Sequence, residues 1–253
     1  MSFVVKGDVF RYIGENDMLD KDIKGLIFDF GGTIDTAGCH WGKFLWHAYQ
    51  RQGVPITEED FRAAYVYGER FLGNNVIIQP NFTLRKTLEV KLRIEMEQLC
   101  IHDVWCADDE EFKEKHQAVL NEVYEQVRKI ISHSKEVLEQ LRKKYPMVLV
   151  TNFYGNMNQV LQEFELNHLF DQVIESSVVK IRKPNPRIFA LGVEALAMKP
   201  QEIMVVGDSF YKDIEPAVKL GCQAAWFKGE GWDDKQYDER VPDLIINDLA
   251  QLL

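Results

Sequence analysis

The 253-residue chain is predicted to be an α/β protein with a parallel sheet and an inserted all-helical domain. Short apolar runs alternate with segments of helical periodicity after residue 131, which is typical of parallel strands joined by right-handed helical crossovers. A further strand is predicted at residues 24–30. Between these parts, about a hundred residues show helical periodicity alone, so they are expected to form the insertion.

The stretch at residues 25–35 organises the rest of the chain. Its apolar run 26–28 has no polar side, which suits a parallel strand covered on both faces. Asp29 follows at once, and Gly31 and Gly32 allow a sharp turn beside a ligand. Open α/β sheets bind ligands at the carboxyl ends of their strands. Taken alone, however, such an Asp is more often a turn or capping residue.

Apolar positions within residues 3–10 favour a short accessory strand or hairpin. After the first core strand, helical spacing predicts helices over 41–50, from Thr57 to about 72, over 83–100 and over 108–131. Thr57 is followed three residues later by Asp60, which resembles a capping box.

The segment 83–100 also alternates as a strand would. Its length and two pairs of opposite charge four residues apart, Glu89 with Arg93 and Lys91 with Glu95, favour the helix instead.

The α/β alternation returns after the insertion. The predicted strands are 147–150, 173–174, 203–206, 224–227 and 244–246. The predicted helices are one from Ser134 to Lys144, one through 160–161, and those at 186–197, 213–220 and 248–253.

Composition excludes several classes of protein. With 46% hydrophobic and 28% charged residues the chain is globular, and its net charge of −10 argues against nucleic acid or anionic membranes as partners. The four cysteines lack paired spacing and there is no signal peptide, so we expect a reduced, cytoplasmic setting. No apolar run approaches the ~18 residues that span a bilayer. The sequence leaves the oligomeric state open and is compatible with a monomer.

Polar groups lie at or shortly after the ends of four predicted strands. They are Asp29, Thr151 with Asn152, Lys183 and Asp208. Because the ends of parallel strands share one edge of the sheet, we expect these side chains to share a pocket. These groups suit phosphoryl transfer. One carboxylate can act as the nucleophile and a second can bind Mg²⁺, while the hydroxyl, amide and ammonium groups bind the phosphoryl oxygens.

With these motifs in this order, the chain resembles the haloacid dehalogenase-like (HAD) hydrolase superfamily from about residue 20 onward. The matching motifs are 29–33, Thr151, Lys183 within 183–186, and 207–209 with Asp213. The resemblance implies a Rossmann-like three-layer core at 1–35 and 132–253 and a helical cap at 36–131. Such a cap selects the substrate, a small phosphorylated molecule, and shields the site from water.

The resemblance also implies which residues hold Mg²⁺. Asp29 is the nucleophile that forms an aspartyl-phosphate and is a metal ligand, Gly31 offers its carbonyl oxygen, and Asp208 is the second carboxylate ligand. Asp213 supports the metal through water or orients the site. A helix N-terminal acid is an equally good explanation of Asp213.

The same resemblance assigns the phosphoryl contacts. Thr151 and Asn152 bind phosphoryl oxygens, and Lys183 stabilises negative charge on the nucleophile and the phosphoryl group. Lys180 and Arg182 are the alternatives to Lys183 as the inward-facing cation.

Gly31 is a departure from the family pattern. Family phosphatases carry there a second Asp that protonates the leaving oxygen, a contribution of ~10² to 10⁴ in rate. The chain is therefore expected to be weak on ordinary monoesters. Such an enzyme would act on compounds whose leaving group needs no proton, such as anhydrides or acyl phosphates, or would take an acid from the cap. His40 and His47 are candidates for that acid. His40, in the loop leading into the cap, is the better placed and is expected to line the substrate site, although a packed or solvent-facing histidine is the more common case.

Two other interpretations remain. One is a protein that binds phosphate compounds with little turnover. The other is different chemistry of the superfamily: phosphonate-cleaving members need a cap lysine that region 60–72 lacks, and dehalogenating members lack the metal carboxylates that Asp208 preserves. The favoured prediction is a Mg²⁺-dependent hydrolase of a small phosphorylated metabolite.

Overall fold

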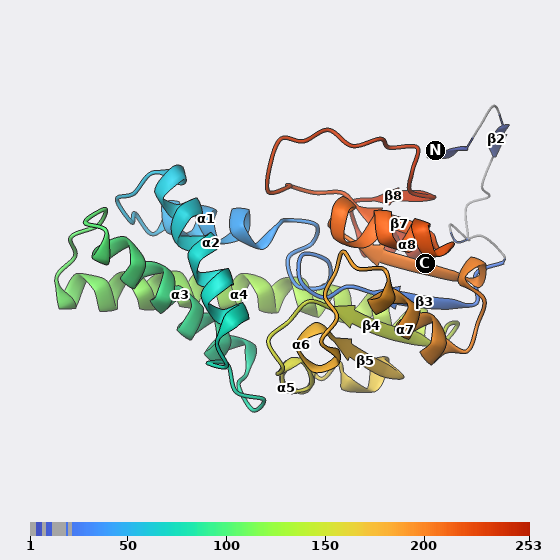
Figure 1. Ribbon diagram of the computed structural model, residues 1–253, viewed down its shortest axis with the longest axis horizontal. Coiled ribbons are helices and arrows are strands. Elements are labelled where there is room, and N and C mark those ends of the chain that lie inside the picture. Colours follow the sequence, from blue (N-terminus) through green and yellow to red (C-terminus); the bar gives the residue numbers. More distant parts are fainter. Residues whose placement is uncertain (1–3, 7–8, 12–18, 20–21) are drawn as a thin grey trace.

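The computed structural model describes residues 4–6, 9–11, 19 and 22–253. Figure 1 shows a sheet covered by helices at one end of the molecule and a group of helices at the other. Helix α4 runs between the two parts. The chain is thus organised as an α/β core carrying a helical insertion, as the sequence predicts.

The core sheet has six strands in the order β5-β4-β3-β6-β7-β8, and every neighbouring pair is parallel. Its strands are β3 (Gly25–Phe28), β4 (Met147–Thr151), β5 (Gln172–Glu175), β6 (Ile203–Gly207), β7 (Gln223–Phe227) and β8 (Leu244–Ile246). Because β3 lies between β4 and β6, the residue that follows it lies near the middle of the carboxyl edge. The five strands predicted after the insertion are all present.

Alternate residues of β3 enter different cores, which makes the sheet the middle of three layers. Ile27 packs with residues of α7 (Arg187–Leu196) and α8 (Glu215–Leu220). Leu26 and Phe28 pack on the opposite face with residues of α4 and α5 (Met157–Glu163). The remaining short helical segments of this part are α6 (Ser176–Val179), a π-helical segment Phe210–Ile214, and 3-10 turns Asn167–Leu169, Pro200–Glu202 and Leu249–Leu252.

The insertion is built from α1 (Trp41–Arg51), α2 (Glu58–Asn74), α3 (Leu84–Ile101) and the first part of α4 (Asp109–Arg142). Side chains at the helix starts accept hydrogen bonds from main-chain N–H groups that have no partner within the helix. Thr57 Oγ1 accepts one from Asp60 N at 3.2 Å, and Thr83 Oγ1 accepts one from Lys86 N at 3.1 Å. The predicted cap at Thr57 and the helical interpretation of 83–100 are confirmed.

The two ion pairs predicted within α3 are wrong, because both cations pair with other residues. Lys91 pairs with Glu69 of α2, not with Glu95. Arg93 pairs with Glu97 instead of with Glu89. Spacing along one helix identifies possible neighbours, but contacts with another helix decide between them.

The prediction of two helices divided near residue 131 is also wrong. Helix α4 is continuous for 34 residues, and its sequence contains no Gly or Pro to interrupt it. Ser134, predicted to cap the second helix, is buried in the middle of α4 and donates a hydrogen bond of 2.8 Å to the carbonyl oxygen of Ile34. The domain boundaries at 35/36 and 131/132 stay a prediction, and α4 crosses the second.

At the start of the chain, β1 (Val4–Lys6) and β2 (Val9–Arg11) pair antiparallel, as expected for an accessory hairpin. The remaining residues of that prediction, 3 and 7–8, and most of the polar run 14–20 lie outside the described residues. Among the residues that are described, no helix is both long and apolar enough to cross a membrane.

Replacing Ser134 with Ala should lower the free energy of unfolding by about 1–2 kcal/mol, because the buried carbonyl of Ile34 loses its donor. Ser132→Ala, at an exposed position of the same helix, is the matched control. Urea unfolding of both variants measures the difference. Equal stability of the two variants would show that this hydrogen bond contributes nothing measurable.

Candidate active site

The carboxyl edge of the sheet brings together residues far apart in sequence. Phe28, the last residue of β3, is in register with Leu149 of β4 and Val206 of β6. Asp29 therefore lies level with the ends of both neighbouring strands, which are followed by further polar groups. The sequence-based expectation that these strand ends share one site is confirmed by the contacts below.

The central contact of the site joins one lysine to two carboxylates. Lys183 Nζ lies 2.7 Å from Asp29 Oδ1 and 2.7 Å from Asp213 Oδ1. All three side chains are buried. Lys183 is therefore the inward cation, whereas Lys180 and Arg182, the alternatives considered from the sequence, are both exposed.

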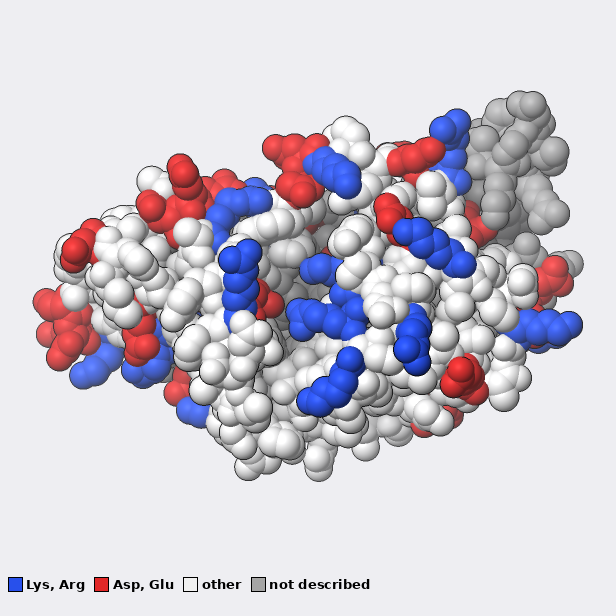
Figure 2. All heavy atoms as spheres, viewed as in Figure 1, with Lys and Arg blue, Asp and Glu red and all other residues white. Residues whose placement is uncertain are grey.

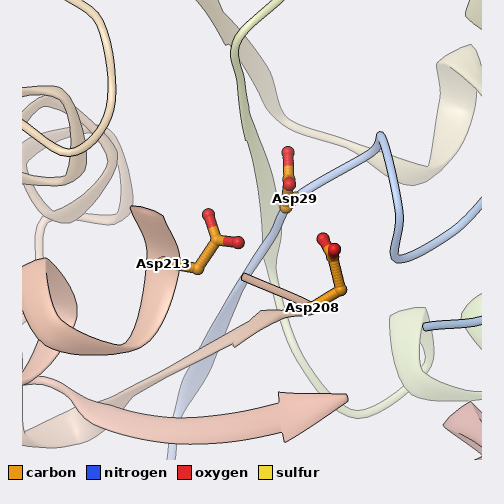
Figure 3. Close-up of side chains that lie close together, drawn as sticks. All are labelled: Asp29, Asp208 and Asp213. Carbon is orange, nitrogen blue, oxygen red and sulfur yellow. The ribbon is translucent and has the colours of Figure 1, made fainter. Parts of the chain in front are cut away.

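Three carboxylates converge around this contact. Carboxylate oxygens of Asp29, Asp208 and Asp213 all lie within 4.8 Å of one another. Figure 3 shows their side chains facing a common space from separate segments. Burial and the charges of Asp213 and Asp29 raise the pKa of Asp208 well above its usual value. Burial also raises the pKa of Asp29 to about 6, although Lys183 opposes this shift.

This donor set fits a hard divalent cation. Three carboxylates balanced by one ammonium leave excess negative charge in a space shielded from water, and a cation relieves it. Neither carboxylate oxygen of Asp213 is free to bind a metal directly. Oδ1 is paired with Lys183, and Oδ2 accepts a 3.0 Å hydrogen bond from Ser209 N. The arrangement favours Asp29 and Asp208 as direct ligands, with Asp213 orienting the site.

Thr33 fixes the position of Asp208. Its hydroxyl oxygen accepts a hydrogen bond of 3.0 Å from the main-chain N of Asp208 and lies 3.4 Å from Asp208 Oδ1. Gly32 lies in the left-handed region (φ +94°), and a Cβ there would be 2.3 Å from the Asp208 carboxylate. A glycine is therefore required at position 32, both by the backbone and by the approach of Asp208.

The space at Gly31 is covered by Trp41. A Cβ on Gly31 would lie 3.5 Å from Trp41 Nε1, an ordinary van der Waals contact. The Trp41 indole donates a 2.9 Å hydrogen bond to Asp35 Oδ2, and Asp35 Oδ1 accepts one of 2.8 Å from Gly32 N. Asp35 thus anchors both the turn after the nucleophile and the aromatic ring above it.

This role of Asp35 was not predicted from the sequence, although the residue lies only two positions after the first motif. Its carboxyl group is fully buried, and burial raises its pKa to about 7. Both of its oxygens are occupied by the contacts with Gly32 and Trp41. Asp35 is accordingly a structural group behind the pocket wall.

His40 lines the cavity but is not placed to act as an acid. Its Nδ1 accepts a 3.0 Å hydrogen bond from Gly42 N and caps α1. Burial, with the charges of Lys212 and Lys91, lowers the pKa of His40 to about 3, so the ring is neutral at pH 7. The other histidine considered, His47, is half-buried, does not line the cavity, and has its Nε2 2.7 Å from Glu230 Oε2.

Thr151 and Asn152 both line the cavity, as their position after β4 predicts. The side-chain amide of Asn152 is bound twice by the main chain of Lys183: Nδ2 donates to the carbonyl oxygen at 3.2 Å, and Oδ1 accepts from N at 2.9 Å. Asn152 therefore positions Lys183. Phosphoryl contacts of Thr151 and Asn152 stay a prediction, and those of Asn152 would come from its main chain.

The cap supplies the opposite wall of the cavity, which has a volume of about 110 Å³. Lys91 is almost fully buried there, contacts Glu69, and lies 4.5 Å from the centre of the Tyr65 ring. Tyr154 of the core donates a 2.7 Å hydrogen bond to the same Glu69. Lys91, Glu69 and Tyr154 were not identified from the sequence, because no local signal shows which polar positions of a cap helix turn to the core.

The loop between β7 and β8 joins the core to the cap through Trp232. Arg62 of α2 donates a 2.7 Å hydrogen bond to the carbonyl oxygen of Trp232, and its guanidinium lies 3.9 Å from the centre of the indole ring. The same ring packs against His40 and Tyr65. A Cβ on Gly42 would lie only 2.0 Å from this indole, so the close fit requires glycine.

Fold and site together are those of a HAD-like hydrolase. Residues 23–221 match the family model described as "haloacid dehalogenase-like hydrolase", so the chain belongs to this family. The prediction of the family made from the four sequence motifs is confirmed.

Individual relatives are similar to different extents. The chain is 31% identical over 137 residues to a glyceraldehyde 3-phosphate phosphatase of Pyrococcus furiosus, covering 53% of this chain and 56% of that one. The match therefore spans about half of that relative. A phosphoglycolate phosphatase of Aliivibrio fischeri is 27% identical over 248 residues, which cover 92% of this chain and 96% of the relative.

Among solved structures, the putative HAD-hydrolase YfnB from Bacillus subtilis, bound to magnesium, superimposes with a TM-score of 0.54. The sequences are 18% identical, and the match covers 91% of this chain and 96% of the other. At this level of identity the likeness shows the shared fold alone.

Behind the cap wall, Glu95 of α3 is fully buried. Tyr49 donates a 3.3 Å hydrogen bond to its Oε2, whereas Oε1 has no hydrogen-bond partner within the described part of the chain. Burial raises the pKa of Glu95 from its ordinary value of 4.5 to about 7. Between these two pH values, the folded protein keeps the proton on Glu95, whereas the unfolded chain has lost it. This carboxyl group therefore destabilises the fold increasingly as pH rises from about 4.5 to 7.

Glu95→Gln should remove this pH-dependent loss of stability, because glutamine carries no titrating carboxyl group. Relative to the wild type, the variant should gain up to about 3 kcal/mol of unfolding free energy between pH 4.5 and 7. Urea unfolding across this pH range measures the gain, with Glu97→Gln, at an exposed position of the same helix, as control. A difference between Glu95→Gln and wild type that does not change with pH would contradict the interpretation.

Proposed function

We propose that the chain is a Mg²⁺-dependent phosphohydrolase that acts on a small phosphorylated metabolite through an aspartyl-phosphate on Asp29, and that it is slow on ordinary monoesters. The observation that carries the proposal is the buried contact of Asp29 with Lys183 inside a group of three carboxylates. The relatives named as phosphatases support the same reaction class.

The first step belongs to Asp29. Its carboxylate attacks phosphorus, a new P–O bond forms, and the bond to the leaving oxygen breaks. Lys183 Nζ and the main-chain N of Phe30, 2.7 Å from Asp29 Oδ1, hold the nucleophile and keep it ionised. In the second step water attacks the same phosphorus, which releases inorganic phosphate and regenerates the carboxylate.

The metal would be held by oxygens of Asp29 and Asp208, with the carbonyl oxygen of Gly31 as a further predicted ligand. When bound, Mg²⁺ supplies neutralisation of negative charge on the phosphoryl oxygens. The magnesium bound to the B. subtilis protein of the same fold is consistent with this choice. Asp213 keeps Lys183 and the turn at Ser209 in place.

None of the groups considered as a general acid is suited to protonate the leaving group. Position 31 has no side chain, His40 is neutral, and both oxygens of Asp35 are occupied. Burial alone would raise the pKa of Glu69, but Lys91 and Tyr154 hold it below its usual value, so this cap residue is a carboxylate. The site therefore suits leaving groups that depart without a proton, such as those of acyl phosphates and anhydrides.

The same observation supports a second candidate function, a binding protein for phosphorylated compounds with little turnover. Such a protein needs the metal and the cationic contacts but no general acid. The two functions differ in whether Asp29 becomes phosphorylated.

With Mg²⁺ and acetyl phosphate, the wild-type protein should gain the mass of one phosphoryl group or release phosphate, because acetate leaves without a proton. Both signals should be lost in Asp29→Asn, and chelation by EDTA should lower them at least 100-fold. Intact-mass spectrometry and a phosphate assay measure them. Absence of adduct and of turnover across a broad set of phosphate compounds would exclude the enzyme and favour the binding protein.

Gly31→Asp should raise kcat on a monoester such as glycerol 3-phosphate by about 10- to 100-fold, because it restores a proton donor. The structure has room for the new Cβ beside Trp41. Gly31→Asn has nearly the same shape but transfers no proton at neutral pH, so it should remain slow. Equal rates for the Asp and Asn variants would refute this account of the missing acid.

A further inference from the structure

We infer that the substrate carries a second anionic group, a carboxylate or a second phosphate, and that Arg182 and Lys212 bind it. This inference rests on the proposed function and names its substrate class. The pair Arg182 and Lys212 is called the second-anion subsite below.

The two cations of the second-anion subsite differ from the other lysines of the cavity. Lys183 is paired with Asp29 and Asp213, and Lys91 is paired with Glu69. Arg182 and Lys212 also line the cavity, but neither forms an ion pair with an acidic side chain within the described part of the chain. Their charges are thus available to a ligand.

The placement of these charges runs against the overall charge of the protein. The chain has a formal net charge of −10, yet the cavity is lined by four cations against three carboxylates, those of Asp29, Glu69 and Asp208. Figure 2 shows Lys and Arg side chains gathered around the hollow between cap and core, while acidic side chains are gathered on the outer part of the cap. Local positive charge in an acidic protein attracts an anion to that place.

Arg182 and Lys212 approach the cavity from different segments. Arg182 immediately precedes Lys183 in the loop after α6, and its charge reaches Glu69 and Tyr65 of the cap. Lys212 lies in the π-helical segment after β6, and its charge reaches His40.

Arg182 is adjacent to Lys183 in the chain, and the charge of Lys212 also reaches Asp208, so a group bound by both cations would lie beside the position of the transferred phosphoryl group. A guanidinium and an ammonium together match a planar carboxylate or a phosphate.

The cavity has room for a compound of a few carbon atoms. Its volume is about 110 Å³, and Tyr65 and Trp41 form part of its wall. The rival explanation is that both cations merely increase attraction for any phosphate. That explanation predicts equal benefit for substrates with and without the second anion.

A pair of three-carbon monoesters separates the two explanations. 3-Phosphoglycerate and glycerol 3-phosphate differ in having a carboxylate or a hydroxymethyl group at the distal end. With Mg²⁺, kcat/KM should be at least tenfold higher for 3-phosphoglycerate. Arg182→Gln and Lys212→Gln should each lower this ratio by about tenfold, through KM for the charged substrate. Lys219→Gln, an exposed lysine of α8 outside the cavity, should leave the ratio unchanged.

Binding gives the same comparison without turnover. In Asp29→Asn with Mg²⁺, calorimetry should show a dissociation constant at least tenfold lower for 3-phosphoglycerate, and the difference should disappear when Arg182→Gln is added. Equal binding of both compounds, or variants that weaken both equally, would overturn the subsite. If no phosphate compound were hydrolysed, the proposed function would fail, while this binding ratio would still decide the present inference.

Discussion

The site depends on the buried ammonium of Lys183 between Asp29 and Asp213. Without it, three carboxylates, two of them buried, would lie within 4.8 Å of one another with no cation between them, at a large electrostatic cost. The contact in turn depends on the fold, because it joins the end of β3, the loop after α6 and the segment after β6. Asn152, directly after β4, adds a fourth segment to the site by forming two hydrogen bonds with the main chain of Lys183.

These core residues could be predicted from the sequence because each is set by local features. An apolar run followed by a carboxylate and glycines specifies a strand end, and parallel strands bring their ends to one edge. The continuity of α4 through residues 131–134, where two separate helices were predicted, could not be inferred from such local features. Ser at a helix start and Ser inside a helix look alike in sequence, and only the distant carbonyl of Ile34 explains the buried hydroxyl.

The cap wall was beyond prediction for a different reason. Lys91 and Glu95 resemble a surface charge pair in the sequence, yet both are buried, and each takes its partner from another helix. Helical periodicity identifies the apolar face of α3, but it does not show that the charged positions beside that face, Lys91 and Glu95, are buried as well by packing against the neighbouring helices. Arg182 was considered from the sequence only as an alternative to Lys183, so its proposed role toward a second anion was not predicted.

Positions 31 and 32 carry the same residue for different reasons. Gly32 has a positive φ, and a Cβ there would overlap Asp208, so backbone and packing both demand glycine. Gly31 has neither constraint: its φ lies outside the left-handed region, and a Cβ would make only ordinary contact with Trp41. The fold therefore does not explain the absence of a side chain at position 31. Under the proposed function the explanation is chemical, since a site whose substrate releases a leaving group that needs no proton has no use for an acid there, and neither has a site that only binds its ligand.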